Sequence, residues 1–224
     1  MFFCCKRILA VPALLAMLTL LFAGTASAQS ASELTSDLQA KYDSLASFES
    51  EFTQVLRNAA SGEEDLRTGK MFFKKPQLIR WENLEPEPEL LVIGQDIVWD
   101  YFEFEEAAYK YPVSDILNSK TMIRFISGQS HLEQDFYVDK EGEEDGLVKL
   151  SLVPKEPETQ LVQAYVWVDP ATHLFKRILL LDFYNNENDL TFENLKENPN
   201  LSDDMFTFTP PEGVEIFDNT QVTE

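Results

Sequence analysis

The side chains that most often carry out catalysis are sparse in this sequence and lack suitably spaced partners. Neither His131 nor His173 has a second histidine at the H-x-x-x-H spacing that binds zinc on one helix face, and His173 follows a turn-like segment. Among 39 acidic residues, neighbours such as Glu105 and Glu106 arise by chance and do not define an acid/base pair. There is no G-x-S-x-G motif and no glycine-rich phosphate loop. We therefore expect no enzymatic activity, no metal site and no cofactor.

The N-terminus has the form of an export signal. Lys6 and Arg7 precede an apolar run, Ile8–Phe22, and the small residues Ala26-Ser27-Ala28 form a cleavage signal. The run is too short, and too closely followed by that signal, for a good transmembrane anchor. We expect cleavage after Ala28, so that residues 1–28 are a signal peptide and residues 29–224 form one soluble, exported domain.

The only two cysteines, Cys4 and Cys5, lie in this leader. The mature chain would then have no disulfide, no thiolate metal ligand and no cysteine nucleophile. No cysteine stands at the end of the apolar run, where lipid attachment would need one. The predicted protein is therefore exported without a lipid anchor of its own and is not embedded in a membrane.

The composition combines strong acidity with a large apolar fraction. A formal net charge of −21 excludes nucleic acid as a partner, since phosphate contacts need clustered Lys and Arg, and it disfavours adsorption to anionic lipid headgroups. We interpret the acidity as a source of solubility. Apolar residues make up 44% of the chain, including 17 Phe, which is enough for a large core.

Residues 30–57 are predicted to form one amphipathic helix. Ser30 and Glu33 have the spacing of a capping box. Apolar residues then recur at steps of three or four, which places them on one helical face: Leu34, Leu38, Tyr42, Leu45, Phe48, Phe52 and Leu56. Such a helix either packs on a sheet or covers an open cavity, and periodicity does not separate the two.

Short strand patterns dominate the rest of the chain. They lie at 71–73, 78–81, 90–93, 97–102, 109–111, 135–138, 147–153, 161–168, 175–181 and 190–195, after a polar loop at 58–68. Residues 113–128 resemble a helical insert, and 206–214 a last short strand that ends in prolines. Hairpin-length connections predict a mainly β, α+β fold: one strongly curved antiparallel sheet, an unclosed β-barrel, with the N-terminal helix and the insert as a lid.

Several strands are apolar on both faces, as in Met71-Phe72-Phe73 and Leu90-Leu91-Val92-Ile93. One interpretation is a sheet buried on both sides. The other is a cavity for an apolar ligand, which is favoured where helices cap a curved sheet rather than fill it.

Three segments resemble one known family. K-K-P-x-x-I-R-W (74–81) is similar to its K-R-P-x-x-F-x-W signature, residues 97–101 to its L-W-x-Y strand, and F-T-F-T-P-P-E-G-V (206–214) to its closing F-x-F-x-P-P-x-G-V. The leader and F-x-x-x-F-x-Q (48–54) also fit. The chain is identified as a member of the LolA family of periplasmic lipoprotein carriers.

This resemblance implies a function as well as a fold. The family binds the acyl chains of lipoproteins in an apolar interior, receives them from the inner-membrane ABC transporter LolCDE and delivers them to the outer-membrane receptor LolB, without enzymatic activity. We expect a monomeric periplasmic chaperone. Two alternatives stay open: a carrier or sensor of another envelope lipid or glycolipid, and an exported hydrolase of envelope polymers.

The candidate site residues follow from strand parity and from the helix pattern. Residues that share parity with Trp81 and Trp99, with two on a later strand, are predicted to line the cavity: Ile79, Trp81, Ile97, Trp99, Tyr101, Leu150 and Leu152. Lid candidates are Leu38, Leu45, Phe52, Met122, Ile123 and Phe125. The resemblance implies that Lys75, where the family usually has Arg, ties the barrel to the lid. Because Lys lacks the planar guanidinium, we expect a lid held less tightly or by a different bonding pattern. Gly94-Gln95-Asp96 replaces the usual Asp-Gly turn.

Overall fold

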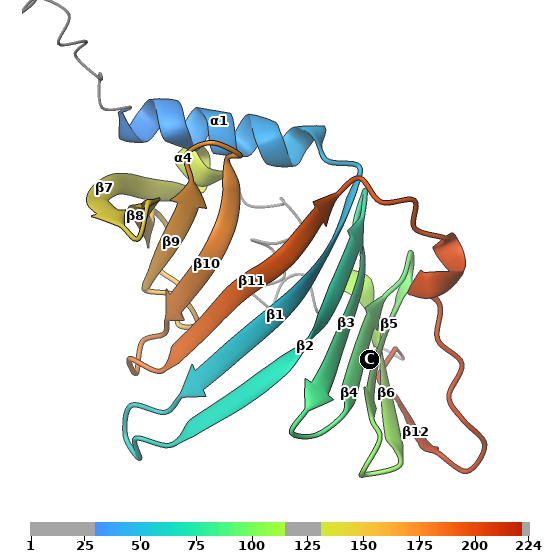
Figure 1. Cartoon of the computed structure of the whole chain (residues 1–224). Helices are drawn as coiled ribbons and strands as arrows, with labels where there is room; N and C mark the ends of the chain where they lie inside the picture. The colour runs from blue at the N-terminus through green and yellow to red at the C-terminus, as the bar shows by residue number, and fades with distance from the viewer. Residues whose placement is uncertain (1–29, 115–130, 221–224) are drawn as a thin grey trace, which may run out of the picture.

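The computed structural model describes residues 30–114 and 131–220, and most of these belong to one twelve-stranded sheet (Figure 1). From one edge to the other the strands are β12 (Glu215–Asp218), β6 (Ala107–Pro112), β5 (Ile97–Phe102), β4 (Glu89–Ile93), β3 (Leu78–Glu85), β2 (Glu64–Lys74), β1 (Ser47–Arg57), β11 (Glu187–Glu197), β10 (Leu174–Leu181), β9 (Gln163–Asp169), β8 (Leu147–Pro154) and β7 (Phe136–Glu144). Neighbouring strands are antiparallel, except that β12 pairs in parallel with β6.

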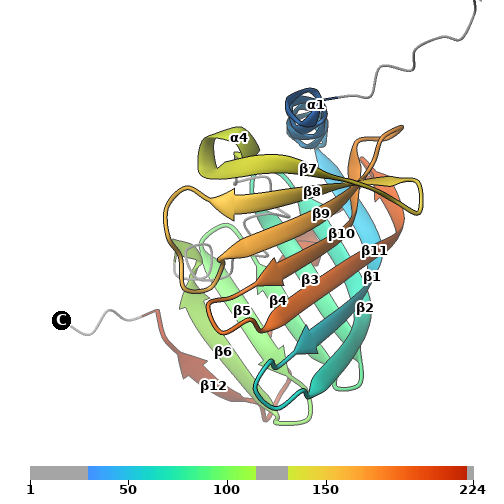
Figure 2. The same cartoon turned by 90° about the vertical axis from the view of Figure 1, so that its left-hand side faces the viewer.

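The sheet curls round an interior without closing. Figures 1 and 2 show β7–β10 facing β2–β5 across that interior, with α1 (Ala31–Ser44) lying over one end. β7 and β12 are the two edges of the sheet, so within the described residues they do not pair with each other. The predicted unclosed barrel with few helices is confirmed. Most of the predicted helical insert, 113–128, lies outside the described residues.

The single long helix predicted for residues 30–57 is wrong. The capping box is present: Ser30 Oγ accepts a hydrogen bond from Glu33 N, and Glu33 Oε2 accepts one from Ser30 N. The hydrogen bonds that the Glu33 carboxylate accepts from Ser30, first from its backbone N–H and second from its hydroxyl, lower the pKa of Glu33. The helix ends at Ser44, however, and β1 begins at Ser47. Phe48, Phe52 and Leu56 are four residues apart, a spacing that keeps one face both in a helix and in a strand, so the pattern was ambiguous.

Other boundaries also differ from the prediction. β2 begins at Glu64, inside the predicted polar loop, and α4 (Leu132–Asp135) precedes β7 where a strand was expected from residue 135. The predicted strand at 206–214 is instead the end of the 3-10 helix η1 (Asp203–Phe206) and an irregular segment, and β12 follows it.

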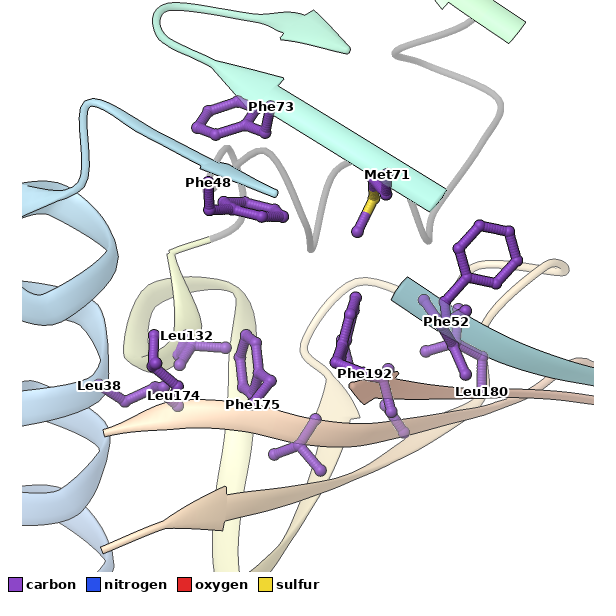
Figure 3. Packing of buried hydrophobic residues seen from close by; sticks show 14 of the residues in the cluster. Leu38, Phe48, Phe52, Met71, Phe73, Leu132, Leu174, Phe175, Leu180 and Phe192 are labelled. Atoms are coloured by element: carbon purple, nitrogen blue, oxygen red, sulfur yellow. The ribbon is translucent and has the colours of Figure 1, made fainter. Parts of the chain in front are cut away.

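Apolar side chains from both walls of the sheet meet in the interior (Figure 3). The central strands β2, β1, β11 and β10 contribute large side chains to this cluster: Phe48, Phe52, Met71, Phe73, Phe175, Leu180 and Phe192. Phe52 and Phe192 are direct cross-strand neighbours, because β1 pairs with β11. This packing, rather than a second sheet, buries the inner face.

The outer face of one wall is covered as well. After β11 the chain crosses β2–β5 as a C-terminal strap, residues 198–219, on which Leu201 and Phe206 bury Leu78. Phe208 of the strap contacts Trp99 and Tyr101, with ring centroids 5.9 and 5.2 Å apart. The strands under the strap are therefore apolar on both faces.

Gly69 of β2 is a close contact point between three strands. A Cβ at this position would lie 1.9 Å from the Glu82 carbonyl oxygen and 2.7 Å from Cζ of Phe52. We expect Gly69→Ala to lower the free energy of unfolding by about 2–3 kcal/mol, because the nearest atom is backbone and cannot rotate away. Denaturant unfolding measures this. Lys70→Ala, an exposed neighbour, should change stability by less than about 0.5 kcal/mol. Equal effects of the two substitutions would contradict the close approach.

Candidate functional site

The apolar interior is the first candidate site. Of the seven residues predicted to line it, Ile79 and Trp81 of β3 and Leu150 and Leu152 of β8 lie on the inner face and belong to the buried cluster. The two pairs come from opposite walls of the sheet. That they contact a ligand stays a prediction.

The other three predicted lining residues, Ile97, Trp99 and Tyr101 of β5, face outward. Val98 pairs with Ile93, and Asp100 pairs with Leu91, and all four of these side chains are buried. Trp99 and Tyr101 instead contact Phe208 of the strap. The assignment failed because the strap buries the outer face, so aromatic residues do not mark the inner side of β5.

Helix α1 closes one end of the interior with an apolar face. Leu34, Leu38 and Leu45 are each at most 1% exposed and join the buried cluster. Leu38 and Leu45, predicted for the lid, are thus on α1 and at its C-cap. Phe52, also predicted for the lid, is a wall residue of β1 whose ring lies 4.7 Å from that of Trp81. The remaining lid candidates, Met122, Ile123 and Phe125, lie outside the described residues.

Polar contacts hold α1 to three other elements. The Tyr42 hydroxyl accepts a hydrogen bond from Phe175 N of β10, at 3.3 Å, and burial of this hydroxyl raises the pKa of Tyr42. Lys41 pairs with Glu197 of β11 at 2.7 Å. Ser32 Oγ donates to Glu133 of α4 at 2.8 Å.

Lys74 and Lys75 bind different parts of the structure. Lys75 Nζ donates to the Asp43 carbonyl oxygen in the last turn of α1, at 2.6 Å, where the helix dipole favours a cation. Lys74 Nζ donates to the Leu201 carbonyl oxygen of the strap at 2.8 Å and pairs with Asp203. Lys75 is therefore placed between barrel and helix, although its function as a latch stays a prediction.

At the end remote from α1 the interior opens into a cavity of about 1160 Å³. The cavity lies at this end because β1 starts beside α1 and runs away from it to Arg57, which lines the cavity wall. Its apolar floor includes Trp81, Leu91 and Leu180, which are core residues. We call this opening the mouth.

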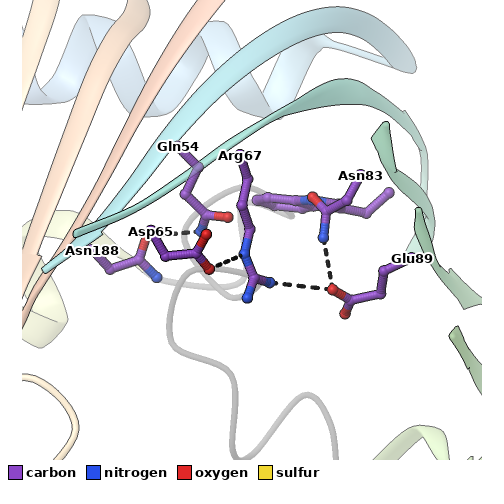
Figure 4. Close-up of polar contacts among 7 residues, drawn as sticks. Gln54, Asp65, Arg67, Asn83, Glu89 and Asn188 are labelled. Atoms are coloured by element: carbon purple, nitrogen blue, oxygen red, sulfur yellow. Dashed lines mark hydrogen bonds and ion pairs between the residues drawn. The ribbon is translucent and has the colours of Figure 1, made fainter. Parts of the chain in front are cut away.

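Hydrogen-bonded polar side chains surround the mouth (Figure 4). Arg67 Nε binds Asp65 at 2.7 Å, and its Nη1 binds Glu89 at 3.2 Å. Asn83 donates to Glu89 at 2.8 Å and accepts from Trp81 Nε1 at 3.0 Å. Gln54 Nε2 donates to Asn188 at 2.9 Å. No sequence signal identified this group, because its members come from five strands.

The two histidines do not come together. His173 lies in the turn between β9 and β10, as predicted, with φ of 55° and its Nε2 3.8 Å from Asp37. His131 precedes α4. Over residues 30–114 and 131–220, no three His, Cys, Asp or Glu side chains are grouped as a metal ion would require, and no helix is long and apolar enough to cross a membrane.

The sequence profile of the family described as "Outer membrane lipoprotein carrier protein LolA" matches residues 43–209. The chain belongs to the LolA family. The match includes the wall strands β1–β11 and the first part of the strap, which together enclose the apolar interior.

Relatives cover most of the chain. An outer-membrane lipoprotein carrier protein of Methylococcus capsulatus is 27% identical over 185 residues, covering 82% of this chain and 87% of the relative. A protein with the same description from Klebsiella pneumoniae is 26% identical over 208 residues, covering 91% and 97%.

A crystal structure of an uncharacterized conserved protein from Thermus thermophilus shares the fold. Its TM-score is 0.56 at 16% identity, with 85% of this chain and 99% of that chain covered. The fold therefore extends to proteins with little sequence similarity to this one.

The contact between Tyr42 and Phe175 gives a test of how firmly α1 is held. Tyr42→Phe removes the acceptor of a partly buried N–H, and we expect a loss of about 1–2 kcal/mol in the free energy of unfolding. Hydrogen exchange should quicken at the Phe175 amide and in α1. Tyr184→Phe, at a position 73% exposed, is the control and should change neither measurement. Unchanged exchange in the Tyr42 variant would show that this contact does not hold the helix.

Proposed function

We propose that this chain is a soluble periplasmic carrier of acylated lipoproteins. The observation that carries the proposal is an apolar interior bounded by a sheet whose edge strands, β7 and β12, are not paired with each other in the described residues. In a closed barrel, ladder hydrogen bonds set the interior width. Here the two walls can move apart without breaking a ladder, so apolar volume can be created for a ligand.

Family membership and the energetics of acyl chains support this ligand. Each buried CH₂ is worth about 0.8 kcal/mol, so a chain of about sixteen carbons costs ~12 kcal/mol to expose to water. A lipid-modified protein therefore needs a carrier to cross an aqueous compartment. An interior that binds by apolar contact accepts many cargoes, because it does not read the attached polypeptide.

The cargo route and the compartment complete the proposal. We infer that residues 1–28 direct export, that the mature chain accepts lipoproteins from LolCDE at the inner membrane, and that it delivers them to LolB at the outer membrane. The relatives described as outer-membrane lipoprotein carrier proteins support lipoproteins as the cargo. The proposal includes no chemical step, since binding and release are sufficient.

The proposed carrier cycle is tested with membranes. Spheroplasts that display a labelled lipoprotein on the inner membrane are incubated with the purified mature protein, and the supernatant is fractionated by size. We expect a soluble one-to-one complex of lipoprotein and carrier. Recovery of free lipid without protein cargo would favour the alternative, a carrier or sensor of another lipid or glycolipid. No release of either kind would contradict the proposal.

In this cycle, Lys75 is proposed to hold α1 over the interior. Lys75→Leu removes the hydrogen bond to the Asp43 carbonyl oxygen, which favours an open state that binds cargo. We expect severalfold more complex from spheroplasts and severalfold slower delivery to LolB. Lys75→Arg should reverse both changes, and Lys70→Leu, on the exposed face of β2, is the matched control. Uptake and delivery that remain unchanged in Lys75→Leu would show that Lys75 is not a latch.

A further inference from the structure

The mouth joins an apolar floor to a charged wall. Trp81, Leu91 and Leu180 form part of the floor and are at most 7% exposed. Asn83, which accepts a hydrogen bond from Trp81, and Gln54, which lines the same cavity, are equally buried and carry polar groups next to this floor. An acyl chain that enters the interior through the mouth would therefore leave its polar end among the polar side chains of the wall.

That wall carries more negative than positive charge. Six carboxylates line the mouth: Glu63, Glu64, Asp65, Glu89, Asp182 and Glu187. Two guanidinium groups, those of Arg57 and Arg67, also line it, so the net charge of the lining is −4 at neutral pH.

Four of these carboxylates form ion pairs with the two arginines. Arg67 lies between Asp65 and Glu89, at 2.7 and 3.2 Å. Arg57 lies between Glu64 and Glu187, at 2.7 and 3.4 Å. Each guanidinium thus has two carboxylate partners, and each group of three retains one negative charge. In a concave, partly desolvated site, such an excess acts on a ligand more strongly than it would on an open surface.

We propose that the mouth selects acylated ligands by the charge of their polar end. An acyl chain attached to an ammonium group enters, because the ammonium is attracted to the carboxylates. An acyl chain attached to a phosphate or carboxylate is disfavoured, because its charge is repelled at the same place. This inference rests on the proposed carrier function, in which phospholipids of the bilayer are the competing acyl-bearing molecules and an acylated polypeptide that carries ammonium groups close to its acyl chains is the favoured one.

The test uses three fluorescent probes with the same pyrene-labelled alkyl chain, ending in a primary amine, a hydroxyl or a carboxylate. Each is titrated into the purified mature protein below its micellar concentration, at low salt and at about 1 M salt, where the screening length is ~3 Å. We expect the amine probe to bind at least ~10-fold more tightly than the carboxylate probe at low salt, with the hydroxyl probe between them. High salt should bring the ratio close to one.

The decisive variant is Glu89→Gln with Glu187→Gln, which keeps side-chain shape and an oxygen acceptor for Arg67 and Arg57. It should reduce the amine-to-carboxylate ratio severalfold and leave the hydroxyl probe unaffected, which also reports an intact cavity. Asp139→Asn with Glu141→Gln on β7 removes the same charge from exposed positions outside the mouth and should retain the wild-type ratio. Should the mouth variant fail to fold, Glu63→Gln with Glu64→Gln at the exposed rim replaces it.

The outcomes separate the two proposals. Equal affinity for all three probes, or a ratio that the mouth variant leaves unchanged, would overturn charge selection and leave the carrier function standing. A ratio that falls equally in the β7 control would assign the effect to the overall charge and overturn the inference as well. If no probe binds, the interior does not take up alkyl chains, and the proposed function itself falls.

Discussion

The burial of one face of a single curved sheet is the constraint on which this structure depends. No second sheet covers that face within the described residues, so the sheet curls until its own walls supply the apolar contacts. Ile79 and Trp81 of one wall and Leu150 and Leu152 of the other belong to a single buried cluster, to which Phe48, Met71 and Phe175 of the strands between also belong (Figure 3). Because β7 and β12 do not pair with each other in the described residues, no ladder of hydrogen bonds between these edge strands fixes the distance between the walls. The stability of the core and the capacity to admit a ligand therefore have the same origin.

The two ends of this interior differ in chemistry. At one end α1 contributes Leu34, Leu38 and Leu45 to the core and is attached through Tyr42 and Lys75 to the barrel. At the other end the interior meets solvent through hydrogen-bonded amides and ion pairs (Figure 4). An apolar seal that can be displaced and a polar opening that can discriminate are compatible with one carrier, because each acts on a different part of an amphiphile.

The strap explains why the inner and outer faces of β5 are hard to distinguish. It buries Leu78 and covers Trp99 and Tyr101, so this wall is apolar on both sides. A wall that is buried on both faces is more stable against unfolding than a sheet with one solvated face, because apolar area on both faces is removed from water. The adjacent Lys74 and Lys75 connect the two coverings: one contacts the strap and the other contacts α1.

Local sequence determined the capping box that starts α1, the hairpin-linked strands and the motifs of the LolA family, because each depends on residues close together in the chain. Ile79, Trp81, Leu150 and Leu152 were also placed on the inner face from alternation alone. The end of α1 at Ser44 was decided by tertiary structure, since the spacing of Phe48 and Phe52 satisfies both helix and strand. The outward direction of Trp99 depends on the strap, more than a hundred residues later in sequence. The mouth brings together side chains of six strands, and only the pairing and curvature of the sheet make them neighbours.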